Sequence, residues 1–494
     1  MIPYEELIKA TEKWGGKTLF ITDQQTEISF EALLERTQKL AGALKEAEIT
    51  KGDVIAVLLP NCVELVELYL AASALGAIFQ PLDIRFRGEE LKNTLAHTQT
   101  RAIVAHGLNV KDIEAVAPDS ILRLLVDGRR EGWKDYEHFI EEGTVLLSAS
   151  KVDEDHDDAM YLFSSGSTGT IKCIPMTYGQ LGYFASDIMN VVGMDPEDCG
   201  ISLLPFSHIS GPVVVNLCLA SGCSCVITQR WKPHVIVDCF EKYRVSWAHT
   251  VPPLGAMILK GRPRGRDLSA VRFIGLMGTS IPVNMLISLE EAIPSCKAIQ
   301  GYGLTETSPM ITLLPLEYHD TKRGSIGRAL ENVEIRVVDE AGKDTNVGEP
   351  GELIVRGPKI FRGYLGNPEL TAKVFKHGWF HTGDIVRFDE EGFFFHLGRK
   401  DDVINCGGLM VYPAEVEAAL IKNPLVEDSV VYGMGDEKRG SKVAAQVVLR
   451  KEASTTAAAL RKYLLGELAN YKVPTHVEIV KSIQRTPSGK PIRN

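Results

Sequence analysis

The stretch VIAVLL at residues 54–59, followed by CVELVELYLAASALG at residues 62–76, decides the fold class. The first run is apolar and has the length of a buried strand, whereas the second has the length of a helix. The same alternation continues through most of the chain. It is typical of α/β folds, so we expect a large N-terminal domain of mostly parallel sheets flanked by helices.

The pattern changes at about residue 335, where short strands alternate with glycine and aspartate turns and indicate a small antiparallel β subdomain. The segment GRKDDVINCGG at 398–408 is rich in charged residues and glycine, as solvated connections between domains often are. A chain of 494 residues also exceeds the size of one hydrophobic core. We therefore predict a large domain at 1–398, a hinge at 399–403 and a small, mobile α/β C-terminal domain at 404–494. Within the small domain we expect helices at 413–422 and 455–468 and strands at 426–433 and 443–449.

The composition argues against several classes of protein. A formal net charge of −10 disfavours a nucleic-acid binder, because such proteins usually carry a basic excess. The most apolar long stretch, residues 211–228, is interrupted by Asn216, Ser221 and Ser224, so we expect no membrane span. The N-terminus mixes charged and apolar residues and does not resemble a secretory signal. We expect a cytoplasmic protein.

The strongest local signal is YLFSSGSTGTIK at 161–172, where an apolar strand runs into a loop of serine, threonine and glycine that ends at Lys172. Backbone N–H groups and hydroxyls in such a loop can surround a phosphate, while the lysine adds a positive charge. The loop is not a Walker A sequence, which requires GxxxxGK[ST]. The alternative is an ordinary Ser/Gly-rich turn between strands.

A second signal is IQGYGLTETSP at 299–309, in which Tyr302 lies between Gly301 and Gly303. These glycines would leave the ring face open to a flat ligand such as adenine. Thr305 and Glu306 supply the hard oxygen ligands that suit Mg²⁺ on a nucleotide. The alternative is a strand-to-helix turn with Thr305 as the N-cap.

Two further stretches carry polar residues that could contact a nucleotide. In WFHTGDIV at 379–386, Asp384 comes just after a glycine turn and could accept both hydroxyls of a ribose. Aspartate is also common in tight turns that have no ligand. In RTPSGKPIR at 485–493, Lys490 lies in a loop near the C-terminus, where basic residues are usually just solvated.

The ordered succession SSGSTGTIK, LPFSHISG, QGYGLTET, GELIVRGPKIFRGYL, HTGD, GRKDD and SGK resembles the adenylate-forming superfamily of acyl-CoA synthetases, amino-acid adenylation domains and beetle luciferases. The resemblance covers nearly the whole chain, from ISFEALLERTQKLAGAL at 28–44 to Lys490. It implies an ATP-dependent carboxylic acid:CoA ligase. Such an enzyme forms an acyl-adenylate and releases pyrophosphate, then forms an acyl-CoA thioester and releases AMP.

The resemblance also implies the residues that bind ATP, Mg²⁺ and coenzyme A. The loop around the ATP phosphates would consist of Ser164, Ser165, Gly166, Ser167, Thr168, Gly169 and Lys172. Around the rest of the nucleotide, Gly301 and Tyr302 would adjoin adenine, and Thr305 and Glu306 would contact phosphate and Mg²⁺. Asp384 would bind the ribose, and Arg399 would make a second contact with the ribose or the phosphate. Asp401 would be the hinge residue, Lys490 would bridge the carboxylate and the α-phosphate, and Gly407 and Gly408 would line the pantetheine passage. The catalytic set that the resemblance implies is Lys490, Glu306, Thr305 and Arg399.

This chain departs from the family in its phosphate loop. The family commonly reads TGxPKG, whereas residues 168–173 read TGTIKC and lack both the proline and the final glycine. Because the proline and the final glycine are missing, we expect an altered loop conformation. Because Lys172 is retained, we expect ATP binding to be retained.

The acid pocket implied by the resemblance has no charged wall. Its residues would be Phe184, His208, Ile209, Gly211, Gly278, Thr279, Gly303 and Met310. His208 resembles the family's aromatic or histidine gate beside this pocket, and the alternative is a structural histidine with satisfied hydrogen bonds. An amino-acid substrate is disfavoured, because burying its ammonium without a carboxylate partner would be costly. A medium-chain, branched, alicyclic or aromatic acid fits this lining.

Three alternatives share the adenylation fold: a ligase that loads a carrier protein, a nucleotide-binding homologue without turnover, and an oxygen-using luciferase. Retention of Lys172, Glu306, Asp384 and Lys490 argues against the homologue without turnover. The expected partners are a small-molecule carboxylic acid, ATP and CoA, and a homodimer is left open.

Overall fold

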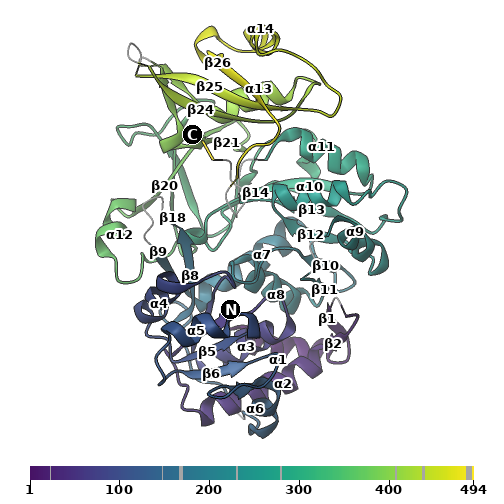
Figure 1. Ribbon diagram of the computed structural model, residues 1–494, viewed down its shortest axis with the longest axis vertical. Coiled ribbons are helices and arrows are strands. Elements are labelled where there is room, and N and C mark those ends of the chain that lie inside the picture. Colours follow the sequence, from purple (N-terminus) through teal and green to yellow (C-terminus); the bar gives the residue numbers. More distant parts are fainter. Residues whose placement is uncertain are drawn as a thin grey trace.

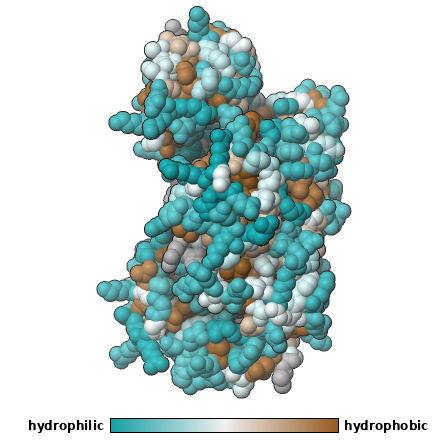
Figure 2. Space-filling view, turned by 90° about the vertical axis from the view of Figure 1, so that its right-hand side faces the viewer, coloured by the Kyte–Doolittle hydropathy of each residue, from teal (hydrophilic) through white to brown (hydrophobic). Residues whose placement is uncertain are grey.

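The computed structural model describes residues 1–22, 24–146, 148–165, 171–229, 232–278, 281–406, 409–436, 440–485 and 492–493. The large domain forms the lower and middle parts of the molecule, and the C-terminal domain lies above it (Figure 1). A space-filling view shows an indentation between the upper lobe and the body, and a surface on which hydrophilic and hydrophobic residues are mixed (Figure 2). The predicted division into parallel sheets, a β subdomain and a small α/β domain is confirmed.

One sheet of the large domain contains the stretch that decided the fold class. VIAVL forms β3 (Val54–Leu58), and the segment after it forms α3 (Val63–Leu75). Neighbouring strands are parallel except for the final antiparallel pair, β8 with β9. The strand order is β7 (Lys134–Asp135), β6 (Leu122–Leu125), β5 (Ala102–Ala105), β3, β4 (Ile78–Pro81), β8 (Asp158–Ser165) and β9 (Ile171–Thr177).

The second sheet is parallel in its centre and antiparallel at both edges. Its strand order is β16 (Arg328–Ala329), β15 (Thr312–Leu313), β14 (Lys297–Tyr302), β13 (Phe273–Leu276), β12 (Trp247–Thr250), β10 (Cys199–Ser202), β11 (Ser224–Ile227), β1 (Thr18–Thr22) and β2 (Glu27–Ser29). In a parallel sheet every carboxyl end lies at the same edge, so the loops after β10, β12, β13 and β14 meet there.

Helices cover both faces of these sheets, as parallel sheets require. A shared core between the two sheets includes residues of α1 (Pro3–Trp14), α2 (Phe30–Glu46), α3, α6 (Tyr136–Glu142), α7 (Tyr178–Val191) and α8 (Ser210–Ser221). The outer face of the second sheet packs on α9 (Pro233–Lys242), α10 (Pro252–Lys260) and α11 (Val283–Ala292). The outer face of the first packs on α4 (Gly88–His97) and α5 (Val110–Val116).

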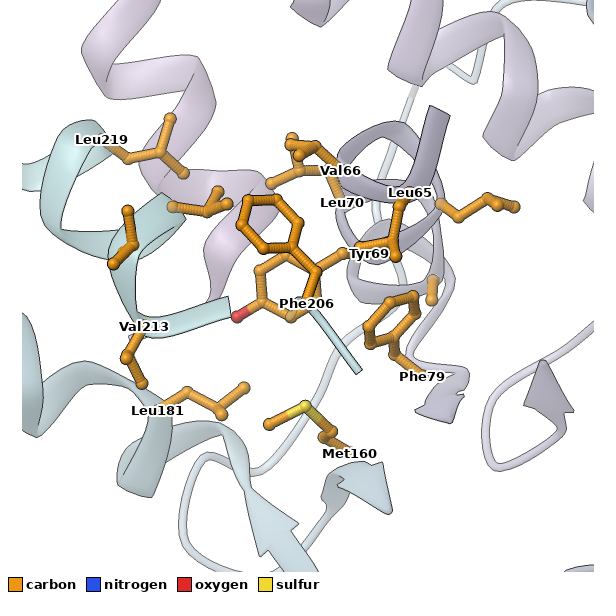
Figure 3. Packing of buried hydrophobic residues seen from close by; sticks show 14 of the residues in the cluster. Leu65, Val66, Tyr69, Leu70, Phe79, Met160, Leu181, Phe206, Val213 and Leu219 are labelled. Carbon is orange, nitrogen blue, oxygen red and sulfur yellow. The ribbon is translucent and has the colours of Figure 1, made fainter. Parts of the chain in front are cut away.

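Part of this shared core fixes the elements that carry the acid-pocket candidates. In the close view, Tyr69 of α3 lies beside Phe206, with Leu181 of α7 and Val213 of α8 nearby (Figure 3). The Tyr69 hydroxyl donates to Asn216 Oδ1 at 3.1 Å, and the Asn216 amide donates to the Leu181 carbonyl at 3.0 Å. These bonds satisfy buried polar groups and join α3, α8 and α7.

The β subdomain is antiparallel, as the closely spaced turns indicated. It consists of β17 (Glu334–Val338), β18 (Gly351–Arg356), α12 (Pro368–Val374), β19 (Phe375–Lys376), β20 (Trp379–Phe388) and β21 (Phe394–Arg399). Short 3-10 helices occur at η1 (Gly107–Asn109), η2 (Thr305–Thr307), η3 (Leu316–Tyr318), η4 (Lys400–Asp402) and η5 (Asn470–Lys472).

The C-terminal domain has a separate core. Its elements are β22 (Ile404–Cys406), β23 (Leu409–Val411), α13 (Pro413–Ile421), β24 (Val426–Asp436), β25 (Gly440–Leu449), α14 (Ala457–Glu467) and β26 (His476–Val480). The expected solvated connection is shorter than the sequence suggested, because Ile404 and Cys406 are buried in β22. Among the described residues, no helix is both long and apolar enough to cross a membrane.

Candidate active site

Asp384 is the centre of a polar cluster at the edge of the β subdomain. His396 Nε2 lies 3.0 Å from Oδ1, and the Tyr302 hydroxyl donates to Oδ2 at 2.7 Å. Arg399 Nη1 donates to the same Oδ2 at 2.9 Å and to the Thr382 carbonyl at 3.0 Å. The cluster thus joins β14 to the consecutive strands β20 and β21, which lie far from β14 in the sequence.

The surroundings of Asp384 keep its carboxyl group ionised. Burial by itself raises the pKa of Asp384, but the hydrogen bond and charge of His396, the charge of Arg399 and the Tyr302 hydroxyl outweigh it, and the pKa is lowered. The expectation that Asp384 follows a tight turn is wrong, because Asp384 lies inside β20. Gly383 before it has φ +71°, and the pairing of β20 with β21 shifts register just beyond, so an irregular strand presents the carboxylate.

Tyr302 is less open than its flanking glycines suggested. Its side chain is buried, and its ring stacks on the His396 ring with centroids 5.9 Å apart. The adjoining Gly303 leaves no room for a side chain, because an added Cβ would lie 1.9 Å from the Pro309 carbonyl oxygen. Glycine at 303 is thus explained by backbone packing, and contact of Tyr302 with adenine stays a prediction.

Glu306 lies in the 3-10 turn η2 and is fixed by the β subdomain. Its Oε1 accepts a hydrogen bond of 3.0 Å from the Tyr364 hydroxyl, and its backbone carbonyl accepts one of 2.9 Å from Phe361 N–H. Within the described part of the chain, the other carboxylate oxygen has no donor, so it could ligate a cation. Thr305 is the first residue of η2 and Leu304 occupies the N-cap, so the interpretation of Thr305 as an N-cap is wrong.

No group of three or more His, Cys, Asp or Glu side chains that could hold a metal occurs among the described residues. A Mg²⁺ ion that arrives with a nucleotide usually keeps waters and takes one or two protein carboxylates in addition to phosphate oxygens. One carboxylate at Glu306 fits this kind of site.

The phosphate-loop candidates begin and end in a β-hairpin. Ser164 and Ser165 lie at the end of β8, and Ser164 pairs with Lys172 of β9. The Lys172 ammonium lies 5.5 Å from the centroid of the Tyr364 ring, so Tyr364 contacts both Lys172 and Glu306. Gly166, Ser167, Thr168 and Gly169 lie outside the described residues.

Cys173, which takes the place of a family glycine, faces away from this cluster. Its side chain is buried among Val54, Ile78 and Tyr161, and burial raises the pKa of its thiol to about 12. Its backbone carbonyl accepts a hydrogen bond from Leu365 N–H at 3.0 Å, next to Tyr364. The strand after the phosphate loop is therefore anchored to the segment that carries Tyr364.

The acid-pocket candidates meet at the carboxyl edge of the second sheet. The loop with His208 follows β10, and Asn61 fixes it by hydrogen bonds of 2.8 Å to the Leu204 carbonyl and from Phe206 N–H. His208 is exposed, and its Nδ1 lies 2.9 Å from Ser210 Oγ. Phe184 of α7 is buried and stacks on His249.

Other pocket candidates serve close packing. Ile209 and Met310 are fully buried in the shared core, and a Cβ at Gly211 would lie 2.5 Å from Phe206 Cα. Gly278 has φ +86°, and a Cβ added there would lie 3.5 Å from the Val251 side chain. Thr279 lies outside the described residues.

The predicted hinge lies between the two domains. Asp401 is exposed in η4, between Lys400, which donates to Glu352 at 2.9 Å, and Asp402, which lies 3.5 Å from Arg493. Gly407, Gly408 and Lys490 lie outside the described residues. On either side of Lys490, Arg485 pairs with Asp428 at 2.7 Å and Arg493 with Glu417 at 2.6 Å.

Three residues of the site were missed by sequence reasoning. Tyr364 lies in GELIVRGPKIFRGYL and His396 in FFFHLG, so a search of the motifs for aromatic hydrogen-bonding groups could have found them. His249 lies in the strand WAHT and carries no comparable signal.

Comparisons with known proteins cover most of the chain. The profile of the AMP-binding enzyme family matches residues 7–365, and that of the AMP-binding enzyme C-terminal domain matches residues 415–490. The chain is 31% identical to 4-coumarate-CoA ligase 1 of Narcissus pseudonarcissus over 94% of this chain and 87% of that protein. It is also 31% identical to 2-succinylbenzoate–CoA ligase of Geobacillus kaustophilus, over 97% of this chain and 96% of that protein.

Two solved structures share the whole fold. ATP-bound MatB from Rhodopseudomonas palustris has a TM-score of 0.89 and 27% identity, with 99% of this chain and 97% of that chain covered. The o-succinylbenzoate CoA synthetase MenE from Bacillus subtilis, in complex with its acyl-adenylate intermediate, has a TM-score of 0.85 and 26% identity, with coverages of 99% and 96%.

Proposed function

We propose that this chain, which belongs to the AMP-binding enzyme family and is an acid–CoA ligase, couples coenzyme A in two steps to a carboxylic acid whose only charged group is the reacting carboxylate. In the first step a carboxylate oxygen attacks the α-phosphorus of ATP, and the bond to the β-phosphate breaks with release of pyrophosphate. In the second step the CoA sulfur attacks the acyl carbon, its proton leaves, and AMP departs. The thioester and AMP are the products, and we propose that the protein acts in the cytoplasm.

The observation that carries the proposal is that the segments which sequence reasoning assigned to ATP meet in the fold, either directly or through Tyr364. Tyr364 contacts Lys172 and Glu306, and Tyr302 contacts Asp384. Tyr302 and Glu306 belong to one short segment at the end of β14. An ammonium, a carboxylate with one oxygen that has no donor among the described residues, and an ionised carboxylate beside an arginine therefore lie around the end of β14 and the adjoining β subdomain.

These residues suit the adenylation step. The attack of a carboxylate on a phosphate brings two anions together, so positive charge must be present where negative charge develops. Lys172 supplies one ammonium at the end of the phosphate loop, and we assign a second to Lys490. Glu306 would hold Mg²⁺, which would supply positive charge against the charge of the phosphates. Asp384 would accept the ribose hydroxyls and so fix the nucleotide for in-line attack.

The second step requires a different arrangement. In the first step Lys490 would contact the carboxylate of the acid, and in the second step the thiol must reach the carbon of that same group. We assign this change to a rotation of the C-terminal domain about Asp401, which lies between the sheets of the two domains. Gly407 and Gly408 would then line the passage for the pantetheine arm, where a missing side chain leaves room.

The acid class follows from the uncharged candidates around the carboxyl edge of the second sheet. Phe184, Ile209 and Met310 are apolar and buried, and none of the pocket candidates is a carboxylate that could pair with a substrate ammonium. The chain's relatives include a ligase named for the aromatic acid 4-coumarate, which supports an aromatic acid.

Pyrophosphate release over a panel of carboxylic acids tests the proposal. We expect sustained release with ATP, Mg²⁺, CoA and a matching acid, together with one thioester for each pyrophosphate. Without CoA, release should stop at about one equivalent per enzyme because the adenylate stays bound. If the thioester forms only on a carrier protein, the acceptor is the carrier protein and not CoA. Absence of pyrophosphate release with every acid would overturn the proposal.

A further inference from the structure

His249 is a buried imidazole whose hydrogen bonding is incomplete. Its side chain is 7% exposed, and its Nδ1 has no partner among the described residues. Most buried polar atoms in folded proteins are paired, and an unpaired one costs stability. An unpaired ring nitrogen on β12, one residue before the end of that strand, therefore points to a partner that comes from outside the chain.

An open space lies beside this imidazole. His249 is in register with Gly275 of β13, and Gly275 with Ile299 of β14, so all three face the same side of the sheet. A methyl group added at Gly275 would have only one atom within 4 Å, the Ala248 carbonyl oxygen at 3.8 Å. Gly200 in the same sheet differs, because there the Trp247 ring lies 2.3 Å from such a methyl. The space over Gly275 is thus not filled by a neighbouring side chain.

The walls of this space belong to the acid-pocket candidates. The Phe184 ring stacks on the His249 ring with centroids 5.4 Å apart and planes 17° apart. His208, at the same edge of the sheet, is close enough for its charge to act on His249. Burial, followed by the charge of His208, lowers the pKa of His249 to about 3, so its imidazole is neutral near pH 7.

Resting on the proposed function, we infer that the space over Gly275 receives the non-reacting end of the acid, and that His249 Nδ1 forms a hydrogen bond with a neutral oxygen group, such as a hydroxyl, carried there. A hydroxyl both donates and accepts, so it can pair with either tautomer of a neutral imidazole. An anionic group could pair only with the tautomer that carries its proton on Nδ1, and its charge would be buried beside a neutral imidazole without a cation, which is costly. His249 is in this view a specificity-determining residue.

The position of His249 also sets the size of the acid. Strands in a sheet lie about 4.8 Å apart, so β12 is about 10 Å across the sheet from β14, which carries Tyr302. The substrate carboxylate reacts near the nucleotide side of this edge. An acid must therefore reach across about two strands, which suits an aromatic or medium-chain acid with its oxygen group at the far end.

Matched pairs of acids test the inference: cinnamate with 4-hydroxycinnamate, 3-phenylpropanoate with 3-(4-hydroxyphenyl)propanoate, and hexanoate with 6-hydroxyhexanoate. The readout is kcat/KM for pyrophosphate release. In the pair with the highest turnover, we expect the wild-type enzyme to prefer the hydroxylated acid by about tenfold, which is the discrimination expected when a buried polar group would otherwise stay unpaired. His249→Phe, which keeps a ring of similar size, should remove this preference and retain turnover of the acid without a hydroxyl.

A second variant examines the space itself. Gly275→Ala should raise KM for the aromatic acids more than for hexanoate, because the added methyl narrows the space beside His249. Gly435→Ala is the matched control, since an added methyl there meets no atom within 4 Å and the residue lies in β24 of the C-terminal domain. Thermal unfolding verifies that each variant is folded.

The outcomes separate this inference from the function on which it rests. A wild-type enzyme that releases pyrophosphate but shows no preference within the pairs would overturn the inference and leave the ligase function intact. A preference that survives in His249→Phe would also overturn it. Absence of pyrophosphate release with every acid would count against the ligase function itself.

Discussion

The hydroxyl of Tyr364 donates a hydrogen bond of 3.0 Å to the carboxylate of Glu306. The bond connects the end of the second parallel sheet with the loop after β18, two segments that meet only in the folded protein. It leaves one Glu306 oxygen without a donor among the described residues and orients the carboxylate. Tyr364 is thus a positioning residue for the proposed Mg²⁺ ligand.

Tyr364→Phe should raise the Mg²⁺ concentration required for half-maximal pyrophosphate release by roughly three- to tenfold, the equivalent of one lost hydrogen bond. The apparent affinity for the acid should change little. Glu306→Gln should have a larger effect in the same direction, because it removes an anionic ligand. An unchanged Mg²⁺ titration in both variants would show that Glu306 does not hold the cation.

The second prediction concerns Asp384 and its pH dependence. The pKa of Asp384 is lowered, so the charged form is the stable one and its contribution is lost only as the pH falls through a value below the usual 3.8. The ATP affinity that depends on this carboxylate should therefore be constant between pH 5 and 8. Asp384→Asn should raise KM for ATP at least about tenfold at every pH in that range. Measuring KM for ATP across this range checks both statements. A steep fall in ATP affinity between pH 8 and 5 that is absent in Asp384→Asn would refute the expected constant affinity.

The parts of the site that the sequence predicted are those that one continuous segment specifies. The alternation that begins at residue 54 indicated the parallel sheets, and the ordered motifs identified Lys172, Glu306 and Asp384 as candidates. Each motif has a local composition with a physical meaning. The roles of these residues stay predictions.

The parts that could not be predicted depend on contacts between distant segments. His396 could not be assigned to Asp384 without the antiparallel pairing of β20 with β21 and its shift in register. The meaning of His249 depends on Gly275 in the neighbouring strand, which only the register of β12 and β13 reveals. Lys359 is similar, because a lysine after a strand is expected in solvent, yet this one is fully buried beside Asp187.

The third prediction concerns this buried ion pair. The Lys359 ammonium lies 2.8 Å and 2.6 Å from the two carboxylate oxygens of Asp187, and the pair joins the loop after β18 to α7, which also carries Phe184. Lys359→Met leaves a buried carboxylate without its cation and should destabilise the protein by about 3–5 kcal/mol. The double variant Lys359→Met with Asp187→Leu should recover much of this loss, because no isolated charge remains. Urea unfolding measures the free energy of unfolding of both variants. If the Asp187→Leu change in the double variant simply adds a further loss to that of Lys359→Met, the two residues are not a coupled pair.

The fourth prediction separates the two half-reactions at Lys490. If Lys490 contacts the carboxylate and the α-phosphate only during adenylation, Lys490→Ala should abolish pyrophosphate release. The same variant should still convert a supplied acyl-adenylate and CoA into thioester at a rate near that of the wild-type enzyme. Lys481→Ala, on the exposed segment after β26, is a control for the loss of a positive charge in the C-terminal domain. Equal loss in both half-reactions would remove Lys490 from its assigned role.

The last prediction is that Asp401→Pro forms the adenylate but makes almost no thioester. Asp401 is exposed in η4, between a large-domain strand that ends at Arg399 and a C-terminal strand that begins at Ile404, so rotation between the domains must change the backbone near this point. Proline fixes φ near −65° and restricts the residue before it, which should prevent that change. Asp401→Ala removes the same carboxylate but leaves the backbone able to rotate, so it should retain thioester formation. Pyrophosphate release limited to about one equivalent per enzyme, with acyl-adenylate trapped, is the expected result for the proline variant. Full thioester turnover in Asp401→Pro, or loss of both half-reactions in a folded protein, would show that the two steps do not depend on rotation at Asp401.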